Sequence, residues 1–435
     1  MSEQNGEPRL LLVYGESREE IAARARAAEA AHGAAVPGSV AGGRCLAVVA
    51  ESAEDARAKL AQGAAALDAG EARVWDSKGV YYLDAPLLSP ARPATIRQNK
   101  LAYLFPGQGS QYVGMLAALR DRFPDVREAL AGFDRALDGV LPAPLSSYIY
   151  PPKAETSEEE KAQADALTAT RIAQPALGAV EMGLHHVLGS FGVEPDMAGG
   201  HSYGELSALV AANAFDRPTL ARLSETRGRL MTEAAGTAKG TMAALDTDRP
   251  TADALVEGID GVVVANHNAP KQVVVSGTED SVQQVLLRAK ERKIRGRELA
   301  VSGAFHSPLV AGAEPRFAEA LAQVEVVPPR YPVYANYTAH PYAPMADSIR
   351  RVLARQLASP VEFVAMVESM YLDGARVFVE VGPRTVLTGL VGRILAEKPH
   401  LAVALDDPRK PGLAPLLHWL GQLAAAGAPV RARPS

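Results

Sequence analysis

The stretch Gly200-His201-Ser202-Tyr203-Gly204 decides the expected fold of this 435-residue chain. It has the pattern G-x-S-x-G, which is typical of a nucleophile elbow, a sharp turn from a strand into a helix that presents a serine oxygen. Residues 197–200 are small enough to end a buried strand, and residues 205–214 have the composition of a helix. The pattern alone also fits an ordinary glycine-rich turn, so its chemistry depends on the groups that the fold brings beside it.

A serine nucleophile requires a base within hydrogen-bond reach, and nine histidines are candidates. His306 stands in Ser302-Gly303-Ala304-Phe305-His306-Ser307-Pro308, at an expected junction between a strand and a helix. Loops at strand ends are where catalytic side chains gather in α/β sheets. His201 would point away from the serine. We therefore expect His306 to be the base, with a structural histidine as the alternative.

A glycine loop, Phe105-Pro106-Gly107-Gln108-Gly109-Ser110-Gln111, follows an apolar strand pattern over residues 101–105. A phosphate-binding function has little support, because the loop has no Gly-Lys-Ser/Thr and lacks the third glycine of a dinucleotide fingerprint. A backbone amide that stabilises an oxyanion beside the elbow is the better interpretation.

The expected fold class is α/β, with a hydrolase-like core around a parallel sheet. Strand patterns at 9–14, 44–50 and 80–83 are separated by helices that begin with capping boxes, which predicts a small N-terminal α/β unit with parallel pairing. A larger α/β unit begins near residue 100. Between residues 240 and 301 the order strand, helix, strand, strand, helix, strand predicts an inserted ferredoxin-like subdomain.

The composition indicates a folded chain, with 48% hydrophobic residues, 22% charged residues and a net charge of -5. No basic block is long enough to follow a phosphate backbone, which argues against a nucleic-acid partner. The longest uncharged stretch, residues 411–430, contains prolines, His418 and Gln422, so we expect no membrane span. Cys45 is the single cysteine, which predicts a cytoplasmic location, and no cluster has metal-ligand spacing.

Six motifs share one order and spacing with a known family. They are Phe105-Pro106-Gly107-Gln108-Gly109-Ser110-Gln111, Gly200-His201-Ser202-Tyr203-Gly204-Glu205, Arg227-Gly228, Ala265-Asn266-His267-Asn268-Ala269-Pro270-Lys271-Gln272, Gly303-Ala304-Phe305-His306-Ser307 and Glu380-Val381-Gly382-Pro383. Over about residues 100–395 the chain resembles malonyl-CoA:acyl carrier protein transacylases, and it looks most like the acyltransferase domains of polyketide synthases.

The resemblance implies a ping-pong acyl transfer without a tightly bound cofactor. Ser202 would attack the thioester of malonyl-CoA while His306 takes its proton, and the acyl group would then pass to the phosphopantetheine thiol of an acyl carrier protein. The backbone amides of Gln108 and Tyr203 would stabilise the oxyanion. The backbone carbonyl of Gln356 would orient the histidine, in place of an aspartate.

Three further residues bear on the acyl group. The resemblance implies that Arg227 pairs with the free carboxylate, because a guanidinium can donate two parallel hydrogen bonds to it. Malonyl-selective members usually read His-Ala-Phe-His where this chain has Gly303-Ala304-Phe305-His306, so Phe305 favours malonyl over methylmalonyl and Gly303 departs from the pattern. Tyr203 stands where modular synthases usually have glutamine. A tyrosine at this position resembles the iterative synthases of enediyne and polyunsaturated fatty acid pathways.

The flanking segments resemble linkers of a larger synthase, which implies the ketosynthase domain of the same synthase as a second partner. The expected divisions are a ketosynthase-to-acyltransferase linker at 1–97, an acyltransferase domain at 98–395 with its large subdomain at 98–229 and 302–395 and its small subdomain at 230–301, and a trailing linker at 396–435. Two alternatives remain: a serine hydrolase of the α/β-hydrolase type that releases the acyl group to water, and a non-catalytic docking domain.

Overall fold

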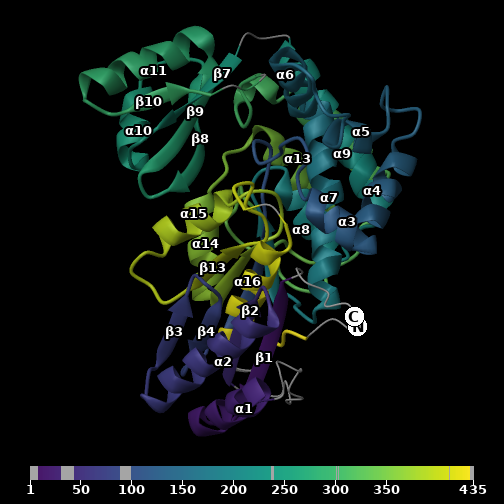
Figure 1. The fold of residues 1–435 in the computed structure, drawn as a ribbon. Coiled ribbons are helices and arrows are strands. Elements are labelled where there is room, and N and C mark those ends of the chain that lie inside the picture. The colour runs from purple at the N-terminus through teal and green to yellow at the C-terminus, as the bar shows by residue number, and fades with distance from the viewer. Residues whose placement is uncertain are drawn as a thin grey trace.

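Three β-sheets form the framework of the chain in the computed structural model, which describes residues 8–30, 44–88, 99–236, 240–299, 301, 303–410 and 412–431. A four-stranded sheet near the N-terminus lies at the bottom of Figure 1, and a five-stranded sheet lies in the centre. A second four-stranded sheet lies at the upper left, beside the long helices of the central unit. The two four-stranded sheets therefore lie at opposite ends of the central one.

The N-terminal unit is α/β, but its sheet is antiparallel, so the expectation of parallel pairing was wrong. Its elements are β1 (Arg9–Gly15), α1 (Arg18–Ala30), β2 (Arg44–Ala50), α2 (Ala53–Asp68), β3 (Arg73–Asp76) and β4 (Val80–Leu83). All three neighbouring pairs in the order β1-β2-β4-β3 run antiparallel. The strand β3 was not expected, and with β4 it forms a hairpin that reverses the chain direction.

Both faces of the N-terminal sheet are covered by helices. Along β2, Leu46 and Val48 pack in the cluster that contains α1 and α2, while Cys45 and Ala47 face the opposite side. That opposite face is covered by α16 (Ala414–Ala425), near the other end of the chain. The expected trailing linker thus packs against the N-terminal unit. The proline-rich segment expected near residues 85–98 falls mostly outside the described residues.

The central sheet is parallel throughout, as expected, with the strand order β11-β6-β5-β12-β13. Its strands are β5 (Lys100–Phe105), β6 (Met197–Gly200), β11 (Val333–Tyr334), β12 (Ala375–Glu380) and β13 (Leu401–Ala404). Alternate residues of β5 enter different hydrophobic clusters, Tyr103 on one face and Leu104 on the other. Since a parallel sheet has helices on both faces, its strands are apolar on both sides.

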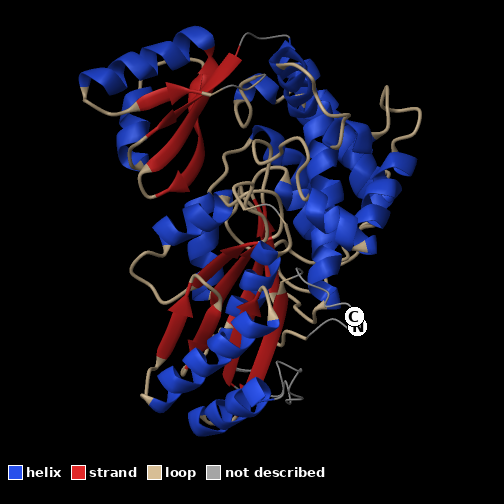
Figure 2. Cartoon of the chain, in the orientation of Figure 1, coloured by secondary structure: helices blue, strands red, loops and turns tan. Residues whose placement is uncertain are grey.

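Helices surround the central sheet in two layers, which Figure 2 shows in blue beside the red strands. The layer around the long helices contains α3 (Ala117–Arg122), α4 (Pro124–Ala136), α5 (Leu145–Ile149), α6 (Ser157–Thr168), α7 (Thr170–Ser190), α8 (Gly204–Ala211), α9 (Arg217–Gly236), α12 (Ala313–Ala322) and α13 (Ala346–Arg355). The other layer contains α14 (Phe363–Leu372) and α15 (Val386–Ile394). Two short 3-10 helices are η1 (Pro308–Val310) and η2 (Gln356–Ala358).

The inserted unit is ferredoxin-like, as expected. Its elements are β7 (Gly240–Leu245), α10 (Arg249–Val256), β8 (Val262–Ala269), β9 (Gln272–Thr278), α11 (Glu279–Glu291) and β10 (Gly296–Glu298). The strands pair antiparallel in the order β10-β7-β9-β8. Thr278 caps α11 by accepting a hydrogen bond from the Ser281 amide, which its sequence pattern predicted.

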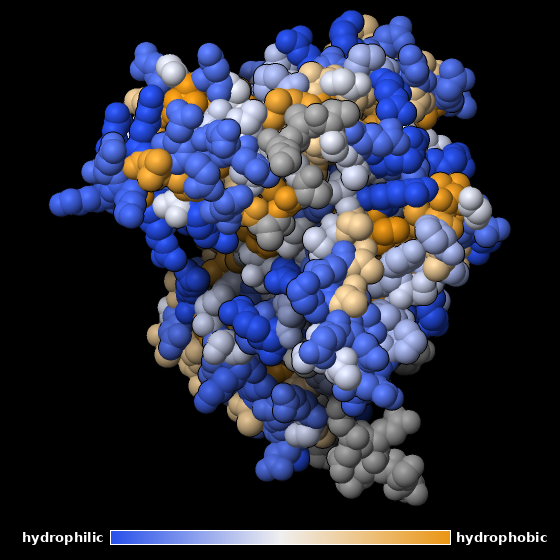
Figure 3. All heavy atoms as spheres, turned by 90° about the horizontal axis from the view of Figure 1, so that it is seen from above, coloured by the Kyte–Doolittle hydropathy of each residue, from blue (hydrophilic) through white to orange (hydrophobic). Residues whose placement is uncertain are grey.

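One expected boundary falls inside a helix of this structure, and one expected linker contains a strand of the central sheet. The boundary between residues 229 and 230 lies within α9, which continues to Gly236. The segment after residue 396 includes β13, which pairs with β12 as an edge strand of the central sheet. No helix among the described residues is both long and apolar enough to cross a bilayer. The face seen in Figure 3 is mainly hydrophilic, with apolar residues in separate small patches.

Candidate active site

The turn from β6 into α8 has the geometry of a nucleophile elbow. Ser202 has a φ of 51°, which is left-handed backbone and uncommon for a residue other than glycine. A Cβ atom on Gly200 would lie 2.0 Å from the carbonyl carbon of Gly204, and one on Gly204 would lie 2.0 Å from the carbonyl oxygen of Phe105. The glycines on either side of the serine are therefore required by close backbone approach, which confirms the elbow prediction.

His306 lies beside the serine, 104 residues further along the chain. The Ser202 Oγ and His306 Nε2 atoms are 2.7 Å apart. On the other side of the ring, Nδ1 lies 3.2 Å from the carbonyl oxygen of Gln356 and 3.1 Å from that of Ser359. These contacts make Nδ1 the donor and Nε2 the acceptor for the serine proton. The prediction named the Gln356 carbonyl, and the structure adds that of Ser359.

Burial keeps the imidazole of His306 neutral. Desolvation lowers its pKa to about 3, and the nearby Arg227 and His201 act in the same direction, against the two carbonyl contacts, which raise it. A histidine with this pKa is unprotonated at pH 7 and is ready to accept a proton.

Gln108 and Tyr203, the two predicted oxyanion residues, lie on adjacent loops. A Cβ atom on Gly107 would lie 2.4 Å from the His201 carbonyl oxygen and 3.6 Å from the Tyr203 amide nitrogen, so the glycine loop packs directly on the elbow. The Gln108 side chain turns toward the start of α7, where its Nε2 lies 3.2 Å from the Thr170 Oγ1. Its backbone, rather than its side chain, therefore remains beside the elbow.

The Tyr203 side chain has a structural environment of its own. Its hydroxyl lies 2.7 Å from the Ser224 Oγ on α9, and a Cβ atom on Gly178 of α7 would lie 2.3 Å from the same hydroxyl. The ring is buried. Tyr203 thus fills a space between α7 and α9 that exists because residue 178 is glycine.

Arg227 projects from α9 to the serine and is fully buried, with 1% of its surface exposed. Its Nη2 donates to the Gln356 Oε1 at 2.9 Å and lies 3.4 Å from the Ser202 Oγ. Its Nε has no hydrogen-bond partner in the structure. Burial lowers the pKa of this guanidinium to about 10, so it remains charged at pH 7. A buried cation with an unused donor is suited to an anionic group of a substrate.

Three polar groups around the dyad were not recognised as functional from the sequence. Asn336, which follows β11, accepts from the Ser202 amide and donates to the Gly200 carbonyl, both at 2.6 Å. The Gln356 side chain donates to the Ser202 carbonyl oxygen at 2.6 Å. The Glu205 carboxylate accepts from the backbone amide of Asn336 at 3.0 Å and from the Gln356 Nε2 at 3.1 Å. Together these groups hold the strained elbow in position.

Glu205 also balances the charge of Arg227 within the buried cluster. Burial raises the pKa of this carboxyl, while hydrogen bonds from Tyr342, Asn336 and Gln356 lower it, as does the charge of Arg227. A signal was present in the sequence, because a carboxylate directly after the elbow stands in the first turn of α8. The pattern was explained as helix composition, so its role in the site was missed.

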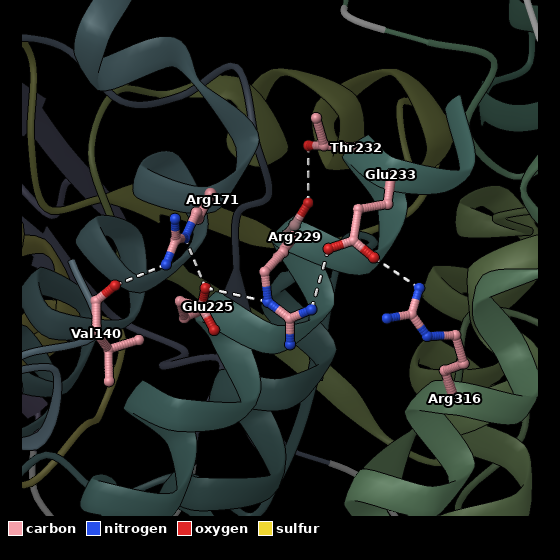
Figure 4. A network of polar contacts seen from close by, with 8 residues as sticks. Val140, Arg171, Glu225, Arg229, Thr232, Glu233 and Arg316 are labelled. Atoms are coloured by element: carbon pink, nitrogen blue, oxygen red, sulfur yellow. Dashed lines mark hydrogen bonds and ion pairs between the residues drawn. The ribbon is translucent and has the colours of Figure 1, made fainter. Parts of the chain in front are cut away.

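The outer side of α9 is fixed by a chain of ion pairs, shown in Figure 4. Glu225 accepts from the Arg171 Nε at 2.6 Å and lies 3.4 Å from the Arg229 Nε. Glu233 pairs with Arg229 at 3.1 Å and with Arg316 of α12 at 2.6 Å. Each pair is partly exposed and contributes little to stability by itself. Together they connect α9 to α7 and α12, which limits rotation of the helix that carries Arg227.

A cavity of about 600 Å³ opens onto the dyad between the central unit and the ferredoxin-like unit. Its lining includes Ser202, Arg227, Phe305 and His306 from the central unit. Val274 and other residues line it from the small sheet. Phe305 therefore lines the same cavity as the dyad.

Gly303 is not among the described residues that line this cavity. A Cβ atom on Gly303 would lie 2.4 Å from the Cβ of Ala235, near the end of α9. The absence of a side chain at residue 303 therefore allows close packing against α9. Among the described residues, no group of three or more histidine, cysteine or carboxylate side chains could hold a metal ion.

Comparison with known proteins agrees with this geometry. The sequence model of the acyl transferase domain matches residues 102–409. The chain belongs to the acyl transferase domain family. It is 35% identical over 322 residues to the malonyl CoA-acyl carrier protein transacylase of Bacillus subtilis (strain 168). The aligned region covers 73% of this chain and 96% of that protein.

Solved structures of other acyltransferases have the same fold. A structure titled PlMCAT:AntF, a malonyl-transacylase in complex with its type II polyketide synthase acyl-carrier protein, matches 72% of this chain and 97% of that chain at 33% identity, with a TM-score of 0.65. The acyl carrier protein S-malonyltransferase of Vibrio cholerae matches 72% of this chain and 98% of that chain at 34% identity, with a TM-score of 0.64.

Longer relatives contain a region similar to this chain as one part. The spectinabilin polyketide synthase protein NorB of Streptomyces orinoci is 36% identical over 75% of this chain, which spans 15% of that protein. A polyunsaturated fatty acid synthase protein from a Thraustochytrium species is 29% identical over 93% of this chain, again 15% of that protein.

The family and the site both disfavour the serine hydrolase alternative. The histidine of this acyltransferase is oriented by two backbone carbonyls, at Gln356 and Ser359, where an α/β-hydrolase uses a carboxylate. The buried Arg227 beside the serine has no function in that alternative.

Proposed function

We propose that this chain transfers a malonyl group from malonyl-CoA to the phosphopantetheine thiol of an acyl carrier protein. The observation that carries the proposal is the position of Arg227, whose buried guanidinium lies 3.4 Å from the nucleophile Ser202 and has an unpartnered Nε. A carboxylate at the far end of the acyl group would pair with it and place the thioester carbonyl at the serine. The names of the relatives, which include malonyl transacylases, support the same substrate.

In the first half-reaction, the Ser202 Oγ attacks the thioester carbonyl carbon and its proton passes to His306 Nε2, 2.7 Å away. The amides of Gln108 and Tyr203 stabilise the resulting oxyanion. The C–S bond then breaks, and the CoA sulfur takes the proton from His306. A malonyl ester on Ser202 remains.

The second half-reaction reverses these steps with a different thiol. His306 takes the proton of the phosphopantetheine thiol, and the sulfur attacks the ester carbonyl carbon. The C–O bond to Ser202 breaks, and His306 returns the proton to the serine oxygen. CoA leaves before the carrier thiol enters, and the acyl carbon keeps its oxidation state throughout, so the transfer requires no redox cofactor.

Selectivity for malonyl over methylmalonyl rests on Phe305, which lines the cavity beside the dyad. Its ring would occupy the space of an α-methyl group. One methyl group in an apolar pocket supplies about 1–3 kcal/mol of discrimination. Gly303 would act indirectly, through its packing against Ala235.

We also propose that the chain works as part of a larger synthase, on the basis of its flanking segments. The similarity to the polyunsaturated fatty acid synthase protein extends over 93% of this chain and so includes the flanks. This supports linkers at both ends, an acyltransferase domain between them and a ketosynthase domain as a neighbour. It also supports an iterative synthase; the enediyne assignment and a cytoplasmic location stay predictions.

The experiment that tests the function follows labelled malonyl groups from malonyl-CoA. The protein is incubated with label and a phosphopantetheinylated carrier protein, and both proteins and free malonate are counted. We expect label on the carrier at a rate that depends on enzyme concentration. Release of free malonate, without label on the carrier, would contradict transfer and restore the hydrolase alternative.

A further inference from the structure

Side chains that follow the carboxyl ends of the central strands form hydrogen bonds to the neighbouring loops. Asn336 after β11 holds the elbow that follows β6. The glycine loop at residues 106–111, which carries the Gln108 amide and is called the oxyanion loop below, follows β5. Two charged residues lie beyond that loop: Arg384 after β12 and Asp406 after β13. Neither touches the dyad, and neither is explained by the proposed reaction.

Arg384 contacts the oxyanion loop directly. Its Nε donates to the carbonyl oxygen of Ser110 at 3.1 Å. Ser110 is buried, and its hydroxyl donates to the Gly107 carbonyl at 2.9 Å within the same loop. A Cβ atom on Gly382 would lie 2.3 Å from the ring of Pro106, so the turn after β12 packs against both ends of the loop.

Asp406 holds Arg384 in turn. Its Oδ2 accepts from the Arg384 amide at 3.0 Å and from the Tyr112 hydroxyl at 2.7 Å. The Arg384 guanidinium lies 5.4 Å from the centroid of the Tyr112 ring, within the range of a cation–π contact. Tyr112 follows the oxyanion loop, so the chain of contacts leaves that loop and returns to it.

The backbone of Arg384 gives independent support. Its φ is 69°, in the left-handed region that favours glycine. A side chain in such a strained conformation persists when the surrounding structure over-determines it, and such residues cluster at functional sites. A glycine would satisfy this turn without strain but could not donate to Ser110.

We propose that Arg384 is a positioning residue for acyl transfer: held by Asp406 and Tyr112, it fixes the Ser110 carbonyl and with it the oxyanion loop that carries the Gln108 amide. This inference rests on the proposed function. The oxyanion forms in the transition state, so a displaced loop lowers kcat and leaves ground-state binding of the thioester nearly unchanged.

The test is the kinetics of malonyl loading by the full chain carrying Arg384→Gly, because glycine accepts the backbone conformation while the side-chain contact is lost. We expect kcat to fall roughly 10- to 100-fold, KM to stay within about twofold, and Tm not to fall. Lys293→Gly is the matched control: Lys293 also has a left-handed φ, 59°, and lies in the ferredoxin-like unit, outside the site. It should load malonyl at the wild-type rate.

Two outcomes would overturn the inference: a wild-type kcat in Arg384→Gly, or an equal fall in the Lys293→Gly control. If Arg384→Gly does not fold, Tyr112→Phe carries the test, since it removes one hydrogen bond to Asp406; a wild-type kcat there would also refute the proposal. Failure of the wild-type chain to load malonyl would instead refute the proposed function, so the two failures are distinguishable.

Discussion

The central parallel sheet and the N-terminal antiparallel sheet differ in what they bury. Around the central sheet, buried positions include Glu205, Arg227, His306 and Asn336, connected by hydrogen bonds. In the described part of the N-terminal unit, residues 8–30 and 44–88, the buried side chains are apolar or aromatic, such as Ile21 and Leu46, and none is charged. The central strands, of 2–6 residues, are no longer than the N-terminal strands, of 4–7 residues, so the contrast does not come from longer strands.

Strand direction explains the contrast. In the central sheet every strand ends at the same edge, so the loops after all five strands meet there and their polar side chains can bond to one another. In the antiparallel sheet successive strand ends lie at opposite edges. The comparison teaches that the buried charges of this chain follow from the convergence of loops, and the predictions below test that.

Arg227→Ala, at the site beside the central sheet, should have the largest effect on malonyl transfer. Removing the guanidinium leaves the acyl carboxylate without its cation, and breaking a buried pair costs about 3–5 kcal/mol, so malonyl transfer should fall roughly 100-fold or more. Acetyl transfer, which needs no partner for a carboxylate, should survive. Steady-state rates with the two thioesters measure this. Equal losses for both would contradict the carboxylate role.

Asn336→Ala should have a smaller effect on the same network. It leaves the Ser202 amide and the Gly200 carbonyl without their partner, and an unsatisfied buried group costs about 1–3 kcal/mol. We expect a lower rate of malonyl loading, by roughly 10-fold, and a lower free energy of unfolding. Single-turnover loading and urea unfolding measure the two. A wild-type loading rate would show that the elbow does not depend on the loop after β11.

Tyr81→Phe tests whether the N-terminal sheet contributes to stability alone. The Tyr81 hydroxyl lies 2.7 Å from the His418 Nδ1 and connects β4 to α16. Its loss should lower the free energy of unfolding by about 1 kcal/mol and leave malonyl transfer unchanged. Chemical unfolding and transfer rates are measured on the same preparation. A changed transfer rate would mean that the two sheets are coupled and that the contrast between them is incomplete.

The pH profile should show the smallest change. Because burial lowers the pKa of His306 to about 3, its base form predominates throughout pH 5–8. The rate of malonyl loading should therefore vary by less than roughly twofold over that range. The same shift means that His306 binds fewer protons in the folded state, so its contribution to stability is lost as pH falls from about 6.5 toward 3. A loading rate that halves near pH 6.5 would contradict a buried neutral base.

Local patterns predicted the parts of this molecule that local physics controls. The elbow was visible because Gly200 and Gly204 are required by backbone contact, and the ferredoxin-like unit because its strands and helices alternate in a distinctive order. The roles of Gln108, Gln356 and Arg227 came from the resemblance, since nothing local distinguishes Arg227 from a solvated helix charge.

What could not be predicted depends on contacts between distant segments. The N-terminal sheet was expected to be parallel because helices separate its predicted strands, but β1 and β2 pair antiparallel across α1, and the hairpin of β3 and β4 was missed. Asn336 lies 134 residues from Ser202, and the chain carries no local signal that the two meet. The contact of α16 with the N-terminal sheet likewise joins opposite ends of the chain. Tertiary packing decides each of these.

The most direct test of the central claim is the intact mass of the protein after exposure to malonyl-CoA. The wild-type chain should gain the mass of one malonyl group, and so should Ser147→Ala, a control at an exposed serine of α5. Ser202→Ala should gain none. Undiminished loading of Ser202→Ala would contradict the assignment of the nucleophile, and with it the account of the parallel-sheet edge as the catalytic site.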